Sequence, residues 1–239
     1  MEIDVYGATF YDIYILGDAP HNSKIIEIPG GSGFNIAYTL YKLGYEINFN
    51  SFIGNDHKGK YLEDMIPFKL EKVEEKTATF ISRNGNPLAV ERKINDSNFK
   101  KIEKKSDVAI ITTELSIKEL IEIEKLGYKK IFFDIGPRPF IAENIFNNAF
   151  VLGTEKECKY RNCNLIKLGN RGIKFNNEIY NSNGKIAKYK TGLGDIFDAF
   201  FIHYILNNYS IEEAIKISID KVEKVLDIPG AYNKINYLI

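Results

Sequence analysis

The second half of the chain alternates short apolar runs with an amphipathic one, and this alternation restricts the available folds most strongly. Residues 107–114 (DVAIITTE), 129–136 (KKIFFDIG), 149–155 (AFVLGTE) and 164–169 (NLIKLG) have the pattern of buried strands, and residues 116–127 (SIKELIEIEKLG) have that of a helix. Buried strands that alternate with helices are typical of a parallel sheet covered on both faces. We therefore expect an α/β chain with a mainly parallel central sheet.

The first half adds two strands, a helix and two hairpins. Residues 3–9 (IDVYGAT) and 47–53 predict strands, and residues 57–66 (HKGKYLEDMI) predict a helix. Short apolar patches on either side of GDAPHNS predict a small hairpin within residues 14–28. Weak alternation with a turn at RNGN predicts a second hairpin over residues 77–93.

The C-terminal part is expected to hold a third hairpin and two helices. KFNNEIY and KIAKYK, joined by NSNG, predict the hairpin within residues 173–190. Apolar residues at helical spacing predict one helix after Asp195 and another over residues 210–226. The length of 239 residues fits one domain, or one domain with a small appendage.

Composition excludes several classes of function. Lys plus Arg equals Asp plus Glu, 32 against 32, so no basic stripe points to nucleic acid. No apolar run approaches the ~20 residues of a membrane span, and the chain starts directly in a strand pattern, so we expect a cytoplasmic protein. Cys158 and Cys163 are too few for a disulfide framework or a metal site, and we expect free thiols.

The stretch TGLGDIFDAF, residues 191–200, has the composition of an anion site beside a carboxylate. Gly192 and Gly194 come just before an apolar helical run, so free backbone amides collect there at a helix N-terminus. This stretch alone is compatible with two roles for Asp195. It caps the helix, or it acts as a general base beside the bound anion.

Two other glycine loops carry weaker signals. GGSGFN precedes a helix, but Ile36 stands at the third glycine position of a dinucleotide fingerprint, so we expect no nicotinamide or flavin site. Asn35, in the first turn of that helix, is either structural or a hydrogen-bonding partner for vicinal hydroxyls. The loop from Gly169 to Gly172 has the composition of a phosphate-approaching turn.

Taken together and in order, these motifs resemble the PfkB or ribokinase-like family of sugar and nucleoside kinases. The resemblance covers almost the whole chain. It rests on the opening strand with Gly7 and Asp12, GGSGFN with Leu43, Gly44, IGND and Gly59, the hairpin at 77–93, FFDIGPR with Asp134 and Arg138, TEKE at 154–157, KLGNRG at 167–172, TGLGDIFDAFF, SIEEAIKIS and PGA at 229–231.

The resemblance implies a ribokinase-like three-layer α/β/α sandwich with a small β lid. Residues 1–239 would form a single kinase domain, with lid strands from about 14–28 and 77–93. In some relatives the lid also forms the dimer interface, which implies a homodimer through the lid. The other possibility for the two hairpins is a decoration at the edge of the main sheet.

The resemblance also implies roles for individual residues. Asp195 would deprotonate the hydroxyl that is phosphorylated, and Glu157 would support Mg²⁺ through water. The anion hole would be formed by the amides of Gly192, Leu193 and Gly194, the substrate hydroxyls would contact Asp12, Gly31 and Asn35, and the nucleotide would lie along Lys167, Gly169, Gly172 and Thr191.

Three positions depart from the family pattern. Thr154 stands where the family usually has Asn, and Tyr189 where many members have an Asp associated with a monovalent cation, which argues against potassium activation. CKYRNC, after Glu157, leaves room for barely a turn where relatives carry a helix. A missing helix uncovers part of the sheet, so we expect a dimer partner or neighbouring helices to cover it.

The implied activity is ATP-dependent, Mg²⁺-assisted phosphorylation of a hydroxyl on a small sugar, polyol or nucleoside. Two alternatives stay open: a vitamin kinase acting on a pyridoxal- or hydroxymethylpyrimidine-like ring, and a non-catalytic relative that binds a sugar or nucleotide. Asp134 and Arg138 lie at a strand end where ligands of parallel sheets bind, but a structural ion pair explains them equally well.

Overall fold

A computed structural model describes residues 1–96 and 102–239. Its largest sheet has eight strands in the order β14-β13-β12-β11-β10-β9-β1-β4. All neighbours from β4 to β12 are parallel, and β13 and β14 add an antiparallel end. The strands are β1 (Glu2–Tyr6), β4 (Glu46–Asn50), β9 (Val108–Thr112), β10 (Lys130–Asp134), β11 (Phe150–Thr154), β12 (Leu165–Lys167), β13 (Ile173–Phe175) and β14 (Glu178–Tyr180).

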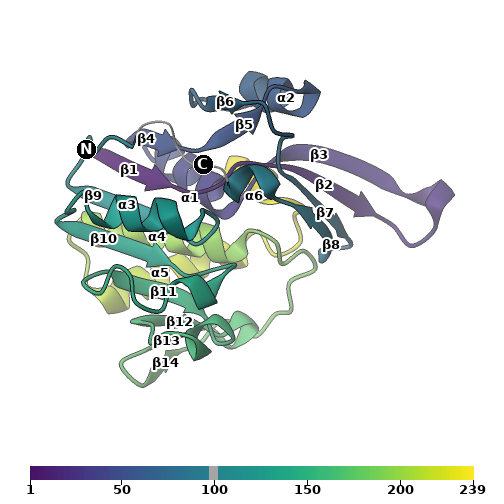
Figure 1. The fold of residues 1–239 in the computed structure, drawn as a ribbon. Helices are drawn as coiled ribbons and strands as arrows, with labels where there is room; N and C mark the ends of the chain where they lie inside the picture. The colour runs from purple at the N-terminus through teal and green to yellow at the C-terminus, as the bar shows by residue number, and fades with distance from the viewer. Residues whose placement is uncertain (97–101) are drawn as a thin grey trace.

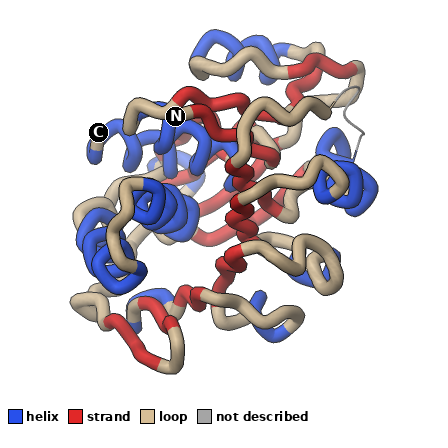
Figure 2. The backbone as a smooth tube through the Cα atoms, turned by 90° about the vertical axis from the view of Figure 1, so that its left-hand side faces the viewer, coloured by secondary structure: helices blue, strands red, loops and turns tan. Residues whose placement is uncertain are grey.

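Helices cover both faces of this sheet (Figure 2). One face packs against α1 (Ser32–Lys42), α4 (Leu193–Leu206), α5 (Ile211–Glu223) and α6 (Ala231–Leu238), and the other against α3 (Ile117–Glu124). Alternate side chains of one strand enter the two cores: Ile110 of β9 lies in the first core, and Ala109 and Ile111 lie in the second. The predicted three-layer sandwich with a mainly parallel sheet is confirmed.

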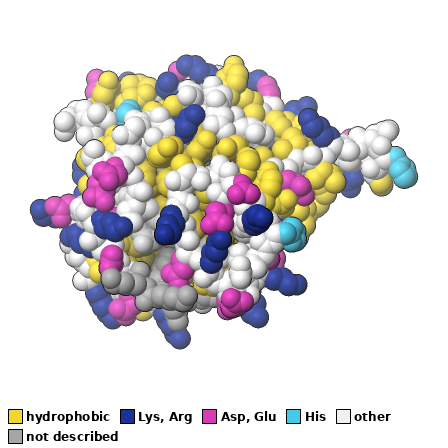
Figure 3. All heavy atoms as spheres, turned by 90° about the horizontal axis from the view of Figure 1, so that it is seen from above, with side chains coloured by type: hydrophobic (Ala, Val, Ile, Leu, Met, Phe, Trp, Pro, Cys, Tyr) yellow, Lys and Arg dark blue, Asp and Glu magenta, His cyan; other side chains and the backbone are white. Residues whose placement is uncertain are grey.

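The two predicted hairpins form a separate four-stranded sheet, which we call the lid. Its order is β3-β2-β7-β8, with β2 (Phe10–Leu16) antiparallel to β3 (Lys24–Gly30) and β7 (Thr79–Arg83) antiparallel to β8 (Asn86–Glu91). The β2–β3 hairpin projects away from the body of the molecule (Figures 1 and 3). The two hairpins therefore pair with each other and not with the edge of the main sheet.

The predicted strand over residues 47–53 is divided between two sheets. β4 ends at Asn50, and β5 (Phe52–Gly54) pairs with β6 (Glu71–Val73) in a two-stranded sheet. The predicted helix follows as α2 (His57–Met65), where the Asp56 side chain caps the Gly59 amide.

The C-terminal predictions need two corrections. The hairpin predicted within residues 173–190 turns at Asn176 and Asn177, whose φ angles are +47° and +68°, so it pairs β13 with β14 and leaves residues 185–190 outside any strand. The other error is α6, a third C-terminal helix that the sequence did not predict. It is only 8 residues long, begins after Gly230, and has too few turns to show a clear period.

The shortened segment after β11 contains a single 3₁₀ turn, η4 (Glu157–Lys159), as the sequence indicated. The expectation of free thiols is wrong, because Cys158 and Cys163 form a disulfide with a Cα–Cα distance of 5.7 Å. Their loop returns on itself after one turn and brings the two sulfur atoms together beside Gly153 of β11.

Loops of the chain pack on this face of the sheet beside α3. Phe146 is fully buried, with its ring centroid 5.0 Å from that of Phe133. The Arg161 guanidinium lies over the Phe133 ring and donates to the carbonyls of Ala142, Ile145 and Phe146. Within the described ranges, no helix is long and apolar enough to cross a membrane.

Candidate functional site

Asp195 lies in the first turn of α4, directly after the glycine pair. Gly192 is the N-cap residue with φ +79°, a left-handed conformation that glycine adopts at little cost. The Leu193 amide donates to the Lys190 carbonyl at 3.2 Å, whereas the Gly192 and Gly194 amides have no acceptor in the described part of the chain. We call these three residues the amide nest; Gly192 and Gly194 supply its unpaired donors.

A hydrogen bond joins the two main glycine motifs. Asn35, in the first turn of α1, donates from Nδ2 to Asp195 Oδ2 at 2.7 Å. Burial raises the pKa of Asp195, and the charge of Asp134 adds to the shift, while Asn35 and Lys167 oppose it. The sequence-predicted base and the sequence-predicted substrate residue therefore meet, although 160 positions separate them.

Asp12 lies on the lid side of the same site. The Tyr14 hydroxyl donates to Asp12 Oδ2 at 3.0 Å, but Asp12 Oδ1 and Asn35 Oδ1 are buried oxygens without a hydrogen-bond partner among the described residues. Burial raises the pKa of Asp12 well above its usual range, and the charges of Glu114 and Asp195 act in the same direction. Buried acceptors of this kind suit hydroxyl donors of a ligand.

Glu114 organises the loop that carries Gly31, and sequence reasoning missed its role. Its Oε2 accepts from the amides of Ala8 and Gly33 at 3.0 and 2.8 Å, and its Oε1 accepts from the Ser32 amide at 2.9 Å. Gly31 has φ +100°, and a Cβ there would lie 2.5 Å from the Ala8 carbonyl oxygen. The one available signal was an acidic residue at the carboxyl end of an otherwise apolar strand.

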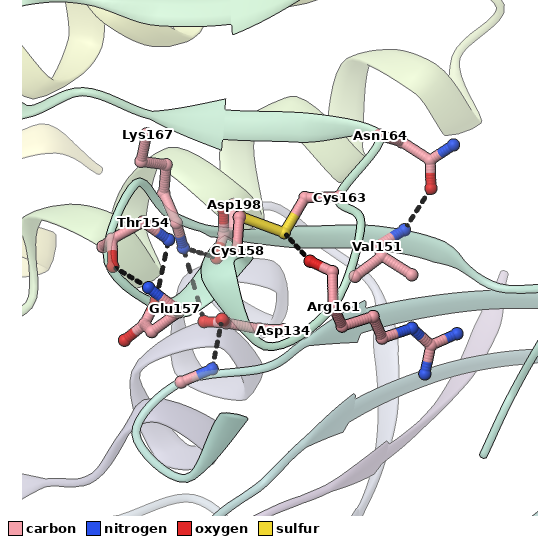
Figure 4. The surroundings of a disulfide bond; sticks show 11 residues. Asp134, Val151, Thr154, Glu157, Cys158, Arg161, Cys163, Asn164, Lys167 and Asp198 are labelled. Atoms are coloured by element: carbon pink, nitrogen blue, oxygen red, sulfur yellow. Dashed lines mark hydrogen bonds and ion pairs between the residues drawn. A yellow bond between two sulfur atoms is a disulfide. The ribbon is translucent and has the colours of Figure 1, made fainter. Parts of the chain in front are cut away.

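A buried ion cluster lies on the other side of the amide nest (Figure 4). Lys167 Nζ is 2.6 Å from Asp198 Oδ2 and 3.4 Å from Asp134 Oδ2. Burial alone would lower the pKa of Lys167, but the two carboxylates raise it above its ordinary value. A Cβ on Gly194 would lie 3.5 Å from Lys167 Nζ, so this cation lies directly beside the nest.

The suggested ion pair between Asp134 and Arg138 does not form. Arg138 instead pairs with Asp96 at 3.0 Å and donates to the Thr113 carbonyl at 2.9 Å. Its guanidinium also donates to the Glu114 carbonyl at 2.7 Å. Arg138 therefore supports the strand end that carries Glu114, and Asp134 belongs to the cluster around Lys167.

A cavity of about 490 Å³ opens beside the nest and the ion cluster. Its lining combines backbone and polar groups with apolar side chains: Thr154, Lys167, Gly169, Asn170, Gly172, Ser182, Asn183, Lys185, Lys190, Leu193, Gly194 and Glu223 with Ile173, Ile186, Ala187, Phe197, Ile219, Val222 and Leu226. The predicted nucleotide residues Lys167, Gly169 and Gly172 line the cavity, and Thr191 does not. A cavity that offers apolar side chains, backbone amides and lysines can hold an aromatic ring and its phosphates.

Glu157 faces the same region from η4. Its Oε2 accepts from the Thr154 amide at 2.7 Å. A Cβ on Gly136 would lie 2.8 Å from Glu157 Oε1 and 3.4 Å from Asp134 Oδ1, so two carboxylates converge around this glycine. Among the described residues no group of three or more His, Cys, Asp or Glu side chains could hold a metal. Mg²⁺ usually takes only one or two carboxylates, with phosphates and water, so this donor set fits it.

No family model matches the chain, and no curated protein matches it. Solved structures do. The chain is similar to ribokinase from Thermotoga maritima (19% identity, 99% of this chain and 98% of that chain, TM-score 0.77). The chain has the ribokinase fold. It is also similar, in the same fold, to a nucleoside kinase from Methanocaldococcus jannaschii (20%, 99% and 97%, 0.69) and to Arabidopsis thaliana ribokinase complexed with ribose and ATP (17%, 99% and 97%, 0.74).

Removing the Glu114 carboxylate should destabilise the protein. Glu114→Ala leaves two buried amides and one half-buried amide without an acceptor, and we expect the free energy of unfolding to fall by about 2 to 4 kcal/mol. Urea unfolding followed by circular dichroism measures this change. Glu122→Ala, at an exposed ion pair on α3, is the matched control and should change the stability by less than about 0.5 kcal/mol. Equal stability of the two variants would contradict the role given to Glu114.

Proposed function

We propose that the chain is an ATP-dependent phosphotransferase of the ribokinase-like family that phosphorylates a hydroxyl of a sugar, polyol or nucleoside. One observation supports the proposal most: Asp195 directly follows Gly194, which lines the cavity suited to a nucleotide, and its carboxylate accepts from Asn35, which carries one of the two unpaired buried oxygens suited to an alcohol. A base placed between donor and acceptor is the arrangement that phosphoryl transfer to an alcohol requires.

The acceptor side favours a polyhydroxylated substrate over the two alternatives. Asp12 Oδ1 and Asn35 Oδ1 accept hydrogen bonds, and together they suit neighbouring hydroxyls. A pyridoxal- or hydroxymethylpyrimidine-like ring offers fewer hydroxyls for these oxygens. Burial raises the pKa of Asp195, which a general base can use, and this supports a catalytic chain over a non-catalytic one.

The donor side supports ATP with Mg²⁺. The apolar side chains of the cavity would hold the adenine ring of ATP. Lys167 and the Gly169–Gly172 loop would lie along its phosphates. The Arabidopsis ribokinase, which has the same fold, is described as complexed with ATP. Glu157 and Asp134 would hold Mg²⁺ through water, and the ion would neutralise charge on the phosphates.

In the proposed reaction the acceptor hydroxyl oxygen attacks the γ-phosphorus of ATP, and its proton passes to the Asp195 carboxylate. The bond from the γ-phosphorus to the bridging oxygen breaks, and ADP leaves. The unpaired amides of Gly192 and Gly194 would stabilise the charge on the transferred group. Closure of the lid would exclude water, which otherwise competes as an acceptor.

The first experiment is ADP release from ATP and Mg²⁺ across a panel of sugars, polyols, nucleosides and vitamin rings. One class of acceptor should stimulate release, and Asp195→Asn should lower kcat by about 10²- to 10⁴-fold because the base is lost. The wild-type rate should rise with pH as Asp195 loses its proton, at a pH above the usual carboxyl pKa because burial raises it. Asp220→Asn, at an exposed ion pair, is the control and should leave the rate unchanged. Binding without turnover across the panel would sink the kinase proposal.

The metal assignment is tested with Glu157→Gln. The loss of one carboxylate charge should raise the Mg²⁺ concentration for half-maximal rate by about tenfold, with little change in the KM for the acceptor. Mg²⁺ titration of the initial rate measures the effect. Glu155→Gln, from the exposed pair with Arg171, is the matched control. An unchanged Mg²⁺ requirement in Glu157→Gln would remove Glu157 from the site.

We also propose a homodimer through the lid. Ile25 on β3 and Leu88 and Val90 on β8 are exposed apolar side chains on the two edge strands of the lid, with exposed fractions of 63%, 59% and 53%. Unpaired strand edges with apolar side chains favour association.

Sedimentation should give twice the chain mass of 27.3 kDa for the wild type. Leu88→Asp should shift the protein toward the monomer, because a charge in an apolar interface is costly. Tyr237→Asp, at an exposed residue of α6, should leave the assembly intact. A wild-type monomer at all concentrations would rule the dimer out.

A further inference from the structure

Lys234 is a fully buried lysine that the proposed reaction does not use. It lies in α6, its exposed fraction is 0%, and its Nζ donates to the Thr191 carbonyl at 2.9 Å. Lysine is seldom fully buried unless it is paired. Within residues 1–96 and 102–239, Lys234 forms no ion pair, and its hydrogen bond uses one of the three donors of the ammonium group. Its burial therefore needs an explanation other than a salt bridge.

The group that Lys234 holds is the first peptide of the amide nest. In a planar trans peptide the carbonyl and the following N–H point in opposite directions. A hydrogen bond that fixes the Thr191 carbonyl therefore also fixes the direction of the Gly192 N–H, one of the two unpaired donors of the nest.

The same helix also holds the nest by packing. A Cβ on Gly192 would lie 2.3 Å from the Cβ of Ala231, so the start of α6 is in close contact with Gly192. Tyr189, just upstream, is anchored in turn by its amide, which donates to the Leu226 carbonyl at 3.1 Å. The Lys234 contact adds a charge at the first peptide of the nest.

The charge state of Lys234 depends on its neighbours. Burial lowers its pKa to about 7, and the charge of Asp195 opposes this shift. A phosphoryl group in the nest would add further negative charge and favour the ammonium form. The cation is therefore most stable when the site is loaded.

We propose that Lys234 is a built-in monovalent cation, a positioning residue whose ammonium group fixes the Thr191–Gly192 peptide so that the Gly192 N–H faces the transferred phosphoryl group. The inference rests on the proposed phosphotransferase function and extends it. A cation that is part of the chain makes the rate independent of added monovalent cations. The residue at position 189 is consistent with this independence, because Tyr189 supplies no carboxylate that could bind a free cation.

The test compares Lys234→Ala, Lys234→Met and the control Lys224→Met, which removes an ammonium group from an exposed pair on α5. Rates are measured in K⁺, Na⁺, NH₄⁺ and tetramethylammonium chloride at equal ionic strength. Wild type and Lys224→Met should give the same rate in every salt. Lys234→Ala should lose about 10- to 100-fold in kcat, with the KM for the acceptor unchanged.

Rescue distinguishes positioning from a merely structural role. NH₄⁺ or K⁺ should restore the kcat of Lys234→Ala by about tenfold, because a small cation fits the space left, whereas tetramethylammonium should not. Lys234→Met should not be rescued, since its side chain fills that space. Full activity of Lys234→Ala, or a loss that no salt reverses, would overturn the proposal. A rate of the wild type that rises on addition of K⁺ would overturn the proposal too. This measurement uses the wild type alone and so does not depend on the folding of a variant.

A binding measurement separates this inference from the proposed function. If the wild type turns over no acceptor, the kinase proposal fails, and calorimetry with ADP and with the β,γ-imido analogue of ATP then tests Lys234 alone. Lys234→Met should bind the analogue about tenfold more weakly than wild type and bind ADP equally well, because only the analogue carries a γ-phosphoryl group for the nest. Equal changes for both nucleotides would refute the role of Lys234.

Discussion

Buried negative charge around Asp195 is the constraint on which the rest of the structure depends. Four carboxyl side chains near this residue are almost inaccessible to water: Asp12, Glu114, Asp134 and Asp198. Carboxylates that share a buried region repel one another and lose ionisation unless cations or N–H donors compensate them. Lys167 supplies one such cation and backbone amides around Glu114 supply the donors, so the ion pairs and the glycine loops are two parts of one charge balance.

This charge balance explains why several positions around the site require glycine. The Glu114 carboxylate receives amides from two separate segments, which brings their backbones together: a Cβ on Gly33 would lie 2.5 Å from the Gly7 Cα. A Cβ on Gly30 would lie 2.1 Å from Asp12 Oδ2. The glycines of GGSGFN therefore permit close approach to a carboxylate and to backbone atoms within the protein. A dinucleotide loop has a different requirement, the approach of a pyrophosphate, and this accounts for the absence of its third glycine.

The sequence predicted the features that have a local cause. The strands between residues 107 and 169 are buried on both faces, so their sequences are apolar throughout. The glycine pairs beside Asn35 and Asp195 predict sharp turns directly. Partners far apart in the chain leave no local signal: Glu114 receives amides 81 to 106 positions away, and Lys234 bonds a carbonyl 43 positions away. The disulfide was missed for a related reason, because composition counts cysteines but does not show how a short loop folds back.

The short connection after β11 leaves Glu157 and Lys167 in place beside the cavity. The η4 turn ends at Lys159, and the Thr154 amide donates to the Glu157 carboxylate and holds it in place. Lys167, at the end of β12, lies in the ion cluster. What would otherwise be lost is cover for the sheet, and the Cys158–Cys163 disulfide together with Arg161 provides it from within the chain. Buried carboxylates that repel one another cost stability unless cations, N–H donors or a ligand compensate them. Under the proposed function, the bound Mg²⁺ and the substrate hydroxyls would supply part of that compensation, so a catalytic chain accounts for this cost better than a non-catalytic one.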